Sequence, residues 1–143
     1  MHDLHNNARS MRVISPVACG VTGTGLTGEV IDTQGYNGVE LIVNYGAVTA
    51  TDATITVSVL AGDTTGALTS VADANLLGTE TLASLPAAST RTSGTSMNVS
   101  KRVGYNGSSR YITLKEVPTV TAAALISATA ILHSPNVAPT PNP

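Results

Sequence analysis

Histidine is the side chain best suited to proton transfer near neutral pH, and all three histidines lie near the ends of the chain. His2 and His5 flank Asp3, and His133 opens a proline-rich C-terminal segment. A Ser–His hydrolase needs a nucleophile with a base held beside it, and the chain contains no Gly-x-Ser-x-Gly motif. His2-x-x-His5 with Asp3 offers ligand types that bind a divalent ion, but a polar terminal segment contains such residues without binding metal. We therefore predict neither a catalytic residue nor a metal site.

Other motifs resemble cofactor or ion sites only in part. Gly23–Gly28 matches the Gly-x-Gly-x-x-Gly pattern of dinucleotide sites, but that pattern needs a helix after it, and Glu29–Asp32 has the composition of a strand. Asp63–Gly66 and Asp73–Asn75 lack the oxygen ligands of a calcium loop, and Asx turns account for both. The carboxylates are scattered, and there is no Trp to hold a sugar ring. We predict no cofactor, and an enzyme is the weakest functional hypothesis.

The composition limits both the core and the partners. With no Phe, no Trp and four Tyr in 143 residues, small aliphatic side chains must fill the core, so extra burial between subunits is expected. The net charge of −2 offers no basic surface for nucleic acid.

Ala122–Leu132 is too short to span a bilayer, and the polar N-terminus lacks the apolar run of a secretory signal. We expect synthesis in the cytoplasm and no membrane partner. Cys19, the single cysteine, is expected to be a small buried side chain.

Alternating apolar and polar residues predict strands along most of the chain. Residues 39–45 place Val39, Leu41, Val43 and Tyr45 on one face, and residues 53–60 alternate in the same way. Weaker strand patterns, separated by turn-forming residues, cover Val13–Cys19, Glu29–Asp32, Leu76–Leu82, Met97–Val103, Tyr111–Val117 and Ala123–Leu132.

Seven or eight short strands at this spacing predict an all-β domain, either a β-sandwich or a jelly-roll-like or Greek-key barrel. The alanine-rich segment Thr119–Ala130 is the one helical alternative. Its β-branched residues and the preceding Pro118 favour a strand.

The tetrapeptide Gly-Tyr-Asn-Gly occurs twice, at residues 35–38 and 104–107, and each copy precedes a predicted strand. Asn-Gly tolerates the positive backbone torsions of a tight reversal. Two interpretations remain open: a coincidence of turn chemistry, or a pseudo-symmetric pair of hairpins.

The patterned region, residues 13–132, is expected to form one β domain between an N-terminal arm, residues 1–12, and a proline-rich tail, residues 133–143. Residues 84–96 lack periodicity and predict a long loop. The prolines, beginning with Pro135, should keep the tail out of the sheet and extended.

Lys101, Arg102 and Arg110 come together if Met97–Val103 and Tyr111–Val117 form a hairpin. Such a group either keeps a sheet edge soluble or docks on an acidic neighbour. Arg9 and Arg12, just before the first predicted strand, have the same two interpretations.

Several segments together resemble the small structural proteins encoded beside the major capsid protein gene of tailed bacteriophages. The resemblance covers the chain from about residue 4 to residue 133, and its motifs are structural. They are Arg12–Val17, Ile31–Tyr36 with Val39–Leu41, Asp73–Gly78, Lys101–Gly107, Arg110–Leu114 and Ala128–Leu132.

The resemblance implies an auxiliary capsid protein (a decoration or cement protein) without catalytic residues. It implies a homotrimer that binds the major capsid protein on the outer surface of the virion. The residues expected at the interface lie in the arm, the loop, the basic group and the tail: Leu4, Arg9, Arg12, Arg91, Lys101, Arg102, Arg110 and His133. The alternatives are a head–tail joining or tail protein, and a carbohydrate-binding or adhesive β-sandwich module.

Overall fold

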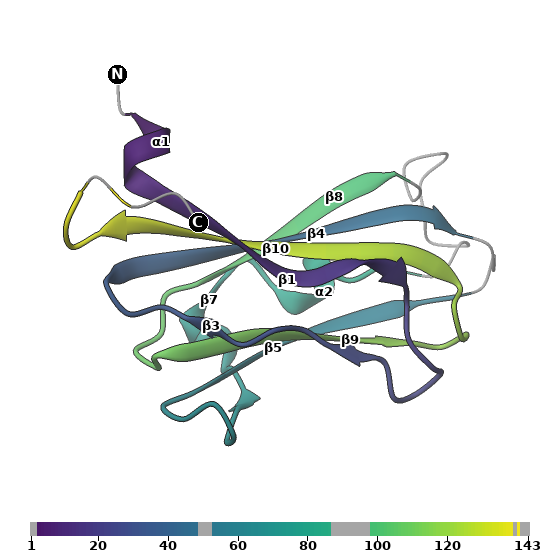
Figure 1. Ribbon diagram of the computed structural model, residues 1–143. Coiled ribbons are helices and arrows are strands. Elements are labelled where there is room, and N and C mark those ends of the chain that lie inside the picture. The colour runs from purple at the N-terminus through teal and green to yellow at the C-terminus, as the bar shows by residue number, and fades with distance from the viewer. Residues whose placement is uncertain (1–2, 49–52, 87–97, 139, 141–143) are drawn as a thin grey trace.

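The computed structural model, which describes residues 3–48, 53–86, 98–138 and 140, contains two antiparallel sheets packed face to face (Figure 1). The predicted all-β sandwich is confirmed. The first sheet has five strands in the order β1 (Ala8–Ala18), β10 (Ala124–Pro135), β4 (Tyr36–Val48), β8 (Val99–Tyr105) and β7 (Leu76–Leu77). The second contains β2 (Leu26–Thr27), β9 (Tyr111–Pro118), β5 (Ile55–Gly62) and β6 (Thr69–Ser70), and β3 (Ile31–Asp32) also pairs with β9.

The core lies between the sheets and follows the alternation of the sequence. Strand β4 buries Val39, Leu41, Val43 and Tyr45, as predicted, and β5 buries the alternate residues from Ile55 to Ala61. The segment with helical composition, Thr119–Ala130, contains no helix, and from Ala124 onward it belongs to strand β10. The small and β-branched residues of this strand alternate between a buried face and a more exposed face. Its inward residues are Ala124, Ile126, Ala128, Ala130 and Leu132. The lone Cys19 is buried, as predicted.

Both ends of the first sheet extend beyond the expected boundaries. β1 begins at Ala8, so residues 8–12, expected in an arm, pair with residues 129–133 of β10. β10 continues through His133 to Pro135, where a strand was not expected. Proline has no N–H to donate, and the next residue, Asn136, donates its N–H to Gly35 O (2.8 Å) instead.

The segment predicted as a strand over residues 76–82 is divided between two elements. Only Leu76–Leu77 pairs, and a short helix, α2 (Glu80–Ala83), follows because the Thr79 hydroxyl caps it by accepting from Leu82 N (3.1 Å). The expected loop then begins with a buried residue, since Leu85 exchanges main-chain hydrogen bonds with Ile55. Residues 87–96 of that loop lie outside the described residues.

The two Gly-Tyr-Asn-Gly segments do not form a symmetric pair of hairpins, and only the first begins in a tight turn, in which Tyr36 N donates to Thr33 O (3.0 Å). The first opens β4 and the second closes β8, and these strands are neighbours, with Val39 opposite Tyr105. The positive φ angle lies at Gly35 (91°), before the strand, and not at Asn37 or Gly38. Cross-strand pairing in the first sheet therefore brings the two copies together, which the spacing alone did not indicate.

The Tyr45 side chain is buried in the core, and among the described aromatic residues it alone donates a hydrogen bond there. Its hydroxyl donates to Ala83 O (2.8 Å), which joins β4 to α2. We predict that Tyr45→Phe lowers the free energy of unfolding by about 1–3 kcal/mol, because it leaves a buried carbonyl without its donor. Tyr36→Phe, at a partly buried ring with no described hydrogen bond from its hydroxyl, is the control and should change stability by less. Equal denaturation midpoints for the two variants would contradict this account.

Candidate functional site

The broadest candidate site is the outer face of the first sheet, meaning the face turned away from the core. Residues directly opposite one another in a ladder share a face, so the pairing defines rows that cross the sheet. One row runs from Arg12 through Thr129 and Ile42 to Arg102. Along the middle of the sheet these rows carry hydroxyl, amide and aliphatic side chains, and the charged residues Arg12 and Arg102 lie toward its two sides.

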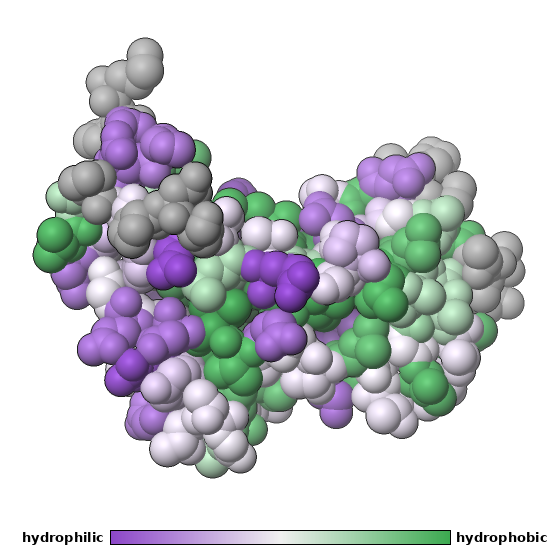
Figure 2. Space-filling view, in the orientation of Figure 1, coloured by the Kyte–Doolittle hydropathy of each residue, from purple (hydrophilic) through white to green (hydrophobic). Residues whose placement is uncertain are grey.

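A cavity of about 400 Å³ lies at one end of this face. Asn44, Ser100 and Ser127 contribute polar groups to it, with Ser100 Oγ donating to Asn44 Oδ1 (2.6 Å). Val17 and Leu125 supply its apolar wall, and they are 43% and 56% exposed. Figure 2 shows that the surface is hollowed between the end that carries α1 (Leu4–Asn7) and the end where β4 finishes and β8 begins.

A second hollow, of about 610 Å³, lies at the β7 edge of the same sheet. Its apolar residues, Leu77 and Leu82, are 56% and 66% exposed. Glu40 and Arg102 border it as an exposed ion pair (3.5 Å). The first sheet thus has two different apolar surfaces, one at the β1 side and one at the β7 side.

The predicted basic group does not form. β8 lies in the first sheet beside β4, and β9 lies in the second beside β5, so the predicted hairpin between them was wrong. Lys101 donates to Ser84 O (2.5 Å), and partial burial lowers the pKa of its ammonium. Arg110 instead makes a bidentate contact with Asp32 (2.9 and 2.7 Å), which holds the pKa of that carboxyl below its usual value.

The other predicted interface residues that the structure describes lie on separate elements of the fold. Leu4 lies on α1 and is 69% exposed. Arg9 and Arg12 lie on β1, the edge strand of the first sheet, on opposite faces. His133 packs across Gly38, where an added Cβ would lie 2.4 Å from its ring. Arg91 lies outside the described residues, as does His2 of the weighed metal motif.

The sequence analysis missed Glu116, a carboxyl group fully buried in the core. It shares the inward face of β9 with Ile112 and Leu114, so strand alternation alone could have located it. Its Oε1 accepts from Gly20 N (2.9 Å), while its Oε2 has no partner. Burial raises the pKa of Glu116, and the main-chain hydrogen bond from Gly20 opposes that rise. The carboxyl group thereby holds the connection between β1 and β2 against the core.

Neither a metal centre nor a membrane span is found in the described part of the chain. No group of three or more His, Cys, Asp or Glu side chains there could hold an ion. Within the same residues, no helix combines the length and apolar character needed to cross a membrane. The Glu116 side chain accepts a hydrogen bond from a main-chain N–H at Oε1. Among the described residues, no nucleophilic side chain is hydrogen-bonded to it.

Comparison with known proteins defines the class of fold. No protein-family model matches the chain, and no curated protein sequence does. Among solved structures, the chain is similar to the SPBc2 prophage-derived protein YomS, with 16% identity over 90% of this chain and 94% of that chain and a TM-score of 0.51. It is less similar to the xylan-binding module CBM15, with 15% identity over 95% and 96% of the two chains and a TM-score of 0.38. At 16% identity the likeness to YomS shows a shared fold alone.

A third similarity involves an enzyme, Xylanase10C from Cellvibrio japonicus, with 14% identity and a TM-score of 0.37. It covers 93% of this chain but 28% of the enzyme, so the chain spans less than a third of that protein. The first two similar structures, a prophage-derived protein and a binding module, are covered almost in full.

The buried Glu116 makes a pH dependence testable. Because its pKa is raised in the folded state, its contribution to stability is complete below the unfolded pKa and is lost as pH rises through the folded value. We predict that Glu116→Gln, which keeps an acceptor oxygen for Gly20 N, removes part of the stability lost over the pH range that begins at the ordinary pKa of a glutamate, about 4. The measurement is the denaturant midpoint across that range.

Glu29→Gln, at an exposed carboxyl, is the matched control and should leave the pH profile of unfolding close to that of the unmodified protein. If the denaturant midpoints of Glu116→Gln and the unmodified protein changed with pH in the same way, the ionisation of the buried carboxyl would have no effect on stability.

Proposed function

We propose that this protein is a structural component of a tailed-phage particle that decorates the outside of the capsid and bridges neighbouring major capsid protein subunits. The observation that carries the proposal is the outer face of the first sheet, which is hollowed and bordered by exposed aliphatic residues. Such a surface fits contact with protein better than it fits chemistry on a small molecule. The prophage origin of YomS supports a phage setting for the shared fold.

The two unlike apolar surfaces of the first sheet support self-association. A contact between Val17 and Leu125 of one copy and Leu77 and Leu82 of the next joins different surfaces. Repetition of such a contact closes a ring when the rotation between successive copies adds up to a full turn. We propose a homotrimer of this kind. Each copy needs only weak contacts with the shell, because a trimer bound at several points gains avidity from their simultaneous engagement.

The proposed mechanism is a shift of the assembly equilibrium. A protein that binds the closed shell, and not its separated subunits, stabilises the shell by mass action. Apolar surface buried at the outer face would supply this binding energy, with the sandwich core acting as a rigid support.

Substitutions on the outer face test the proposal. Leu125→Glu and Ile42→Glu place a charge on the proposed contact face, and each is expected to lower the number of copies per particle about tenfold by desolvating that charge. The measurement is quantitative mass spectrometry of purified particles from a phage or prophage whose own copy of the gene has been replaced by the variant.

Thr56→Glu, on the exposed face of β5 in the second sheet, is the control and should leave occupancy unchanged. Melting temperatures within a few degrees of the unmodified protein would exclude loss of folding as the cause. Full occupancy by Leu125→Glu and Ile42→Glu would show that the outer face does not contact the capsid. Binding of the purified protein to a glycan array, and not to particles, would favour a carbohydrate-binding or adhesive module.

A further inference from the structure

The two edges of the first sheet differ greatly in length. β1 is an edge strand of eleven residues, whereas β7 at the opposite edge has two. In the second sheet, the described outer strands β2, β3 and β6 also have two residues each. A long edge strand presents unpaired main-chain N–H and C=O groups that can pair with another chain. β1 is therefore the longest strand at a described edge of either sheet.

The register shows which main-chain groups of β1 face away from the sheet. Residues of an antiparallel strand direct their N–H and C=O alternately to the two sides. Ala8 O accepts from Thr140 Oγ1 (3.1 Å) on the open side, which places the groups of Ser10 and Arg12 on that side also. At the other end, Val13 O accepts from Glu29 N (2.7 Å). Between these points, no described residue bonds to the outward groups of Ser10 and Arg12, and both residues are exposed.

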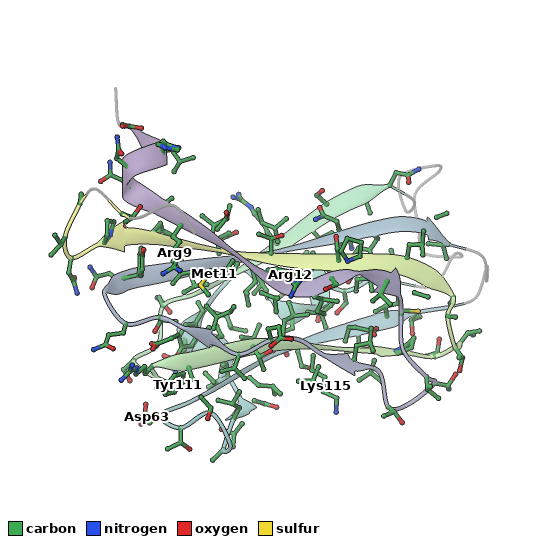
Figure 3. The ribbon with its side chains drawn as sticks, in the orientation of Figure 1. Arg9, Met11, Arg12, Asp63, Tyr111 and Lys115 are labelled. Carbon is green, nitrogen blue, oxygen red and sulfur yellow. The ribbon has the colours of Figure 1, made fainter. Side chains whose placement is uncertain are left out.

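The open stretch is also basic and lacks counter-charge. Neither Arg9 nor Arg12 forms an ion pair with any described residue, whereas Arg102 and Arg110 both do. The Nε of Arg9 is buried without a hydrogen-bond partner, which is costly for a charged group. Figure 3 shows Arg9, Met11 and Arg12 in succession along β1. The strand contains no Asp or Glu.

We propose that the Ser10–Arg12 stretch of β1 is a binding site for an extended, acidic segment of another protein chain, which adds to the first sheet as an edge strand. Main-chain hydrogen bonds to Ser10 and Arg12 supply affinity, and carboxylates opposite Arg9 and Arg12 supply selectivity. This site goes beyond the proposed capsid role, since it defines the chemistry of a partner in whatever assembly provides it.

A second copy of β1 fits the site poorly. Two copies paired edge to edge would bring four arginines and no carboxylate to the shared seam. A segment with an acidic residue opposite Arg9, an aliphatic residue opposite Met11 and an acidic residue opposite Arg12 matches both the charges and the half-buried Met11 between them.

The probe is a labelled, end-capped peptide of sequence Thr-Glu-Val-Thr-Glu-Thr, titrated into the full-length protein and followed by NMR. We expect amide shifts confined to residues 8–13 of β1. The same peptide with Lys in place of both Glu residues should bind at least about tenfold more weakly, and Arg9→Gln and Arg12→Gln should each weaken binding of the Glu peptide about three- to fivefold.

Main-chain pairing between the peptide and β1 can be tested without changing the protein. N-methylation of alternate peptide residues blocks the N–H groups on one side of the extended peptide only. One alternation phase should abolish binding and the other should be tolerated. Ser10→Pro, which removes an outward N–H without removing a bond to β10, should act like the damaging phase.

Equal binding of the Glu and Lys peptides, equal effects of the two N-methylation phases, shifts centred on other strands, or no binding at millimolar peptide would each overturn the inference. These outcomes are separate from particle occupancy. Peptide binding by a protein that is absent from particles would support this site and contradict the proposed capsid role. Presence in particles without peptide binding would support the capsid role and contradict this site.

Discussion

The whole architecture depends on packing two sheets together with few aromatic rings in the core. Tyr45 and Tyr105 are the described aromatic residues that are buried, and the remaining volume is filled by Val, Ile, Leu and Ala from both inner faces. Small side chains fill space well only when strand alternation is regular, because each missing methyl group would leave a cavity. This explains why β4, β5 and β10 alternate so consistently.

Such a core leaves the distinctive chemistry of the chain outside it or at its margin. The buried Glu116 ties a connection to the core, and the Asp32–Arg110 pair joins β3 to the start of β9. Neither arrangement brings a nucleophile and a base together. The features without a structural use are on the surface of the first sheet: exposed aliphatic side chains and the unpaired arginines of β1. The proposed role therefore rests on surface shared with other subunits.

Period-two alternation was enough to predict the fold class and the central strands, because burial on one face determines which residues can occupy it. It located Val39–Tyr45 on the correct face and identified β10 as a strand. It could not show that residues 8–12 belong to β1, since polar residues such as Arg9 and Ser10 pair there through main-chain groups that side-chain patterns do not report. The separation of Lys101 from Arg110 depends on which sheet each strand joins, which is a property of topology. Glu116 was missed because a buried carboxyl contradicts the usual preference of charged groups for water.

The central claim is that this protein acts through repeated contact with neighbouring subunits. Counting copies of the unmodified protein per purified particle, relative to the major capsid protein, tests it most directly. The account predicts a regular stoichiometry within a few-fold of the capsid protein. Absence from mature particles, together with a monomeric protein free in the infected cell, would contradict it.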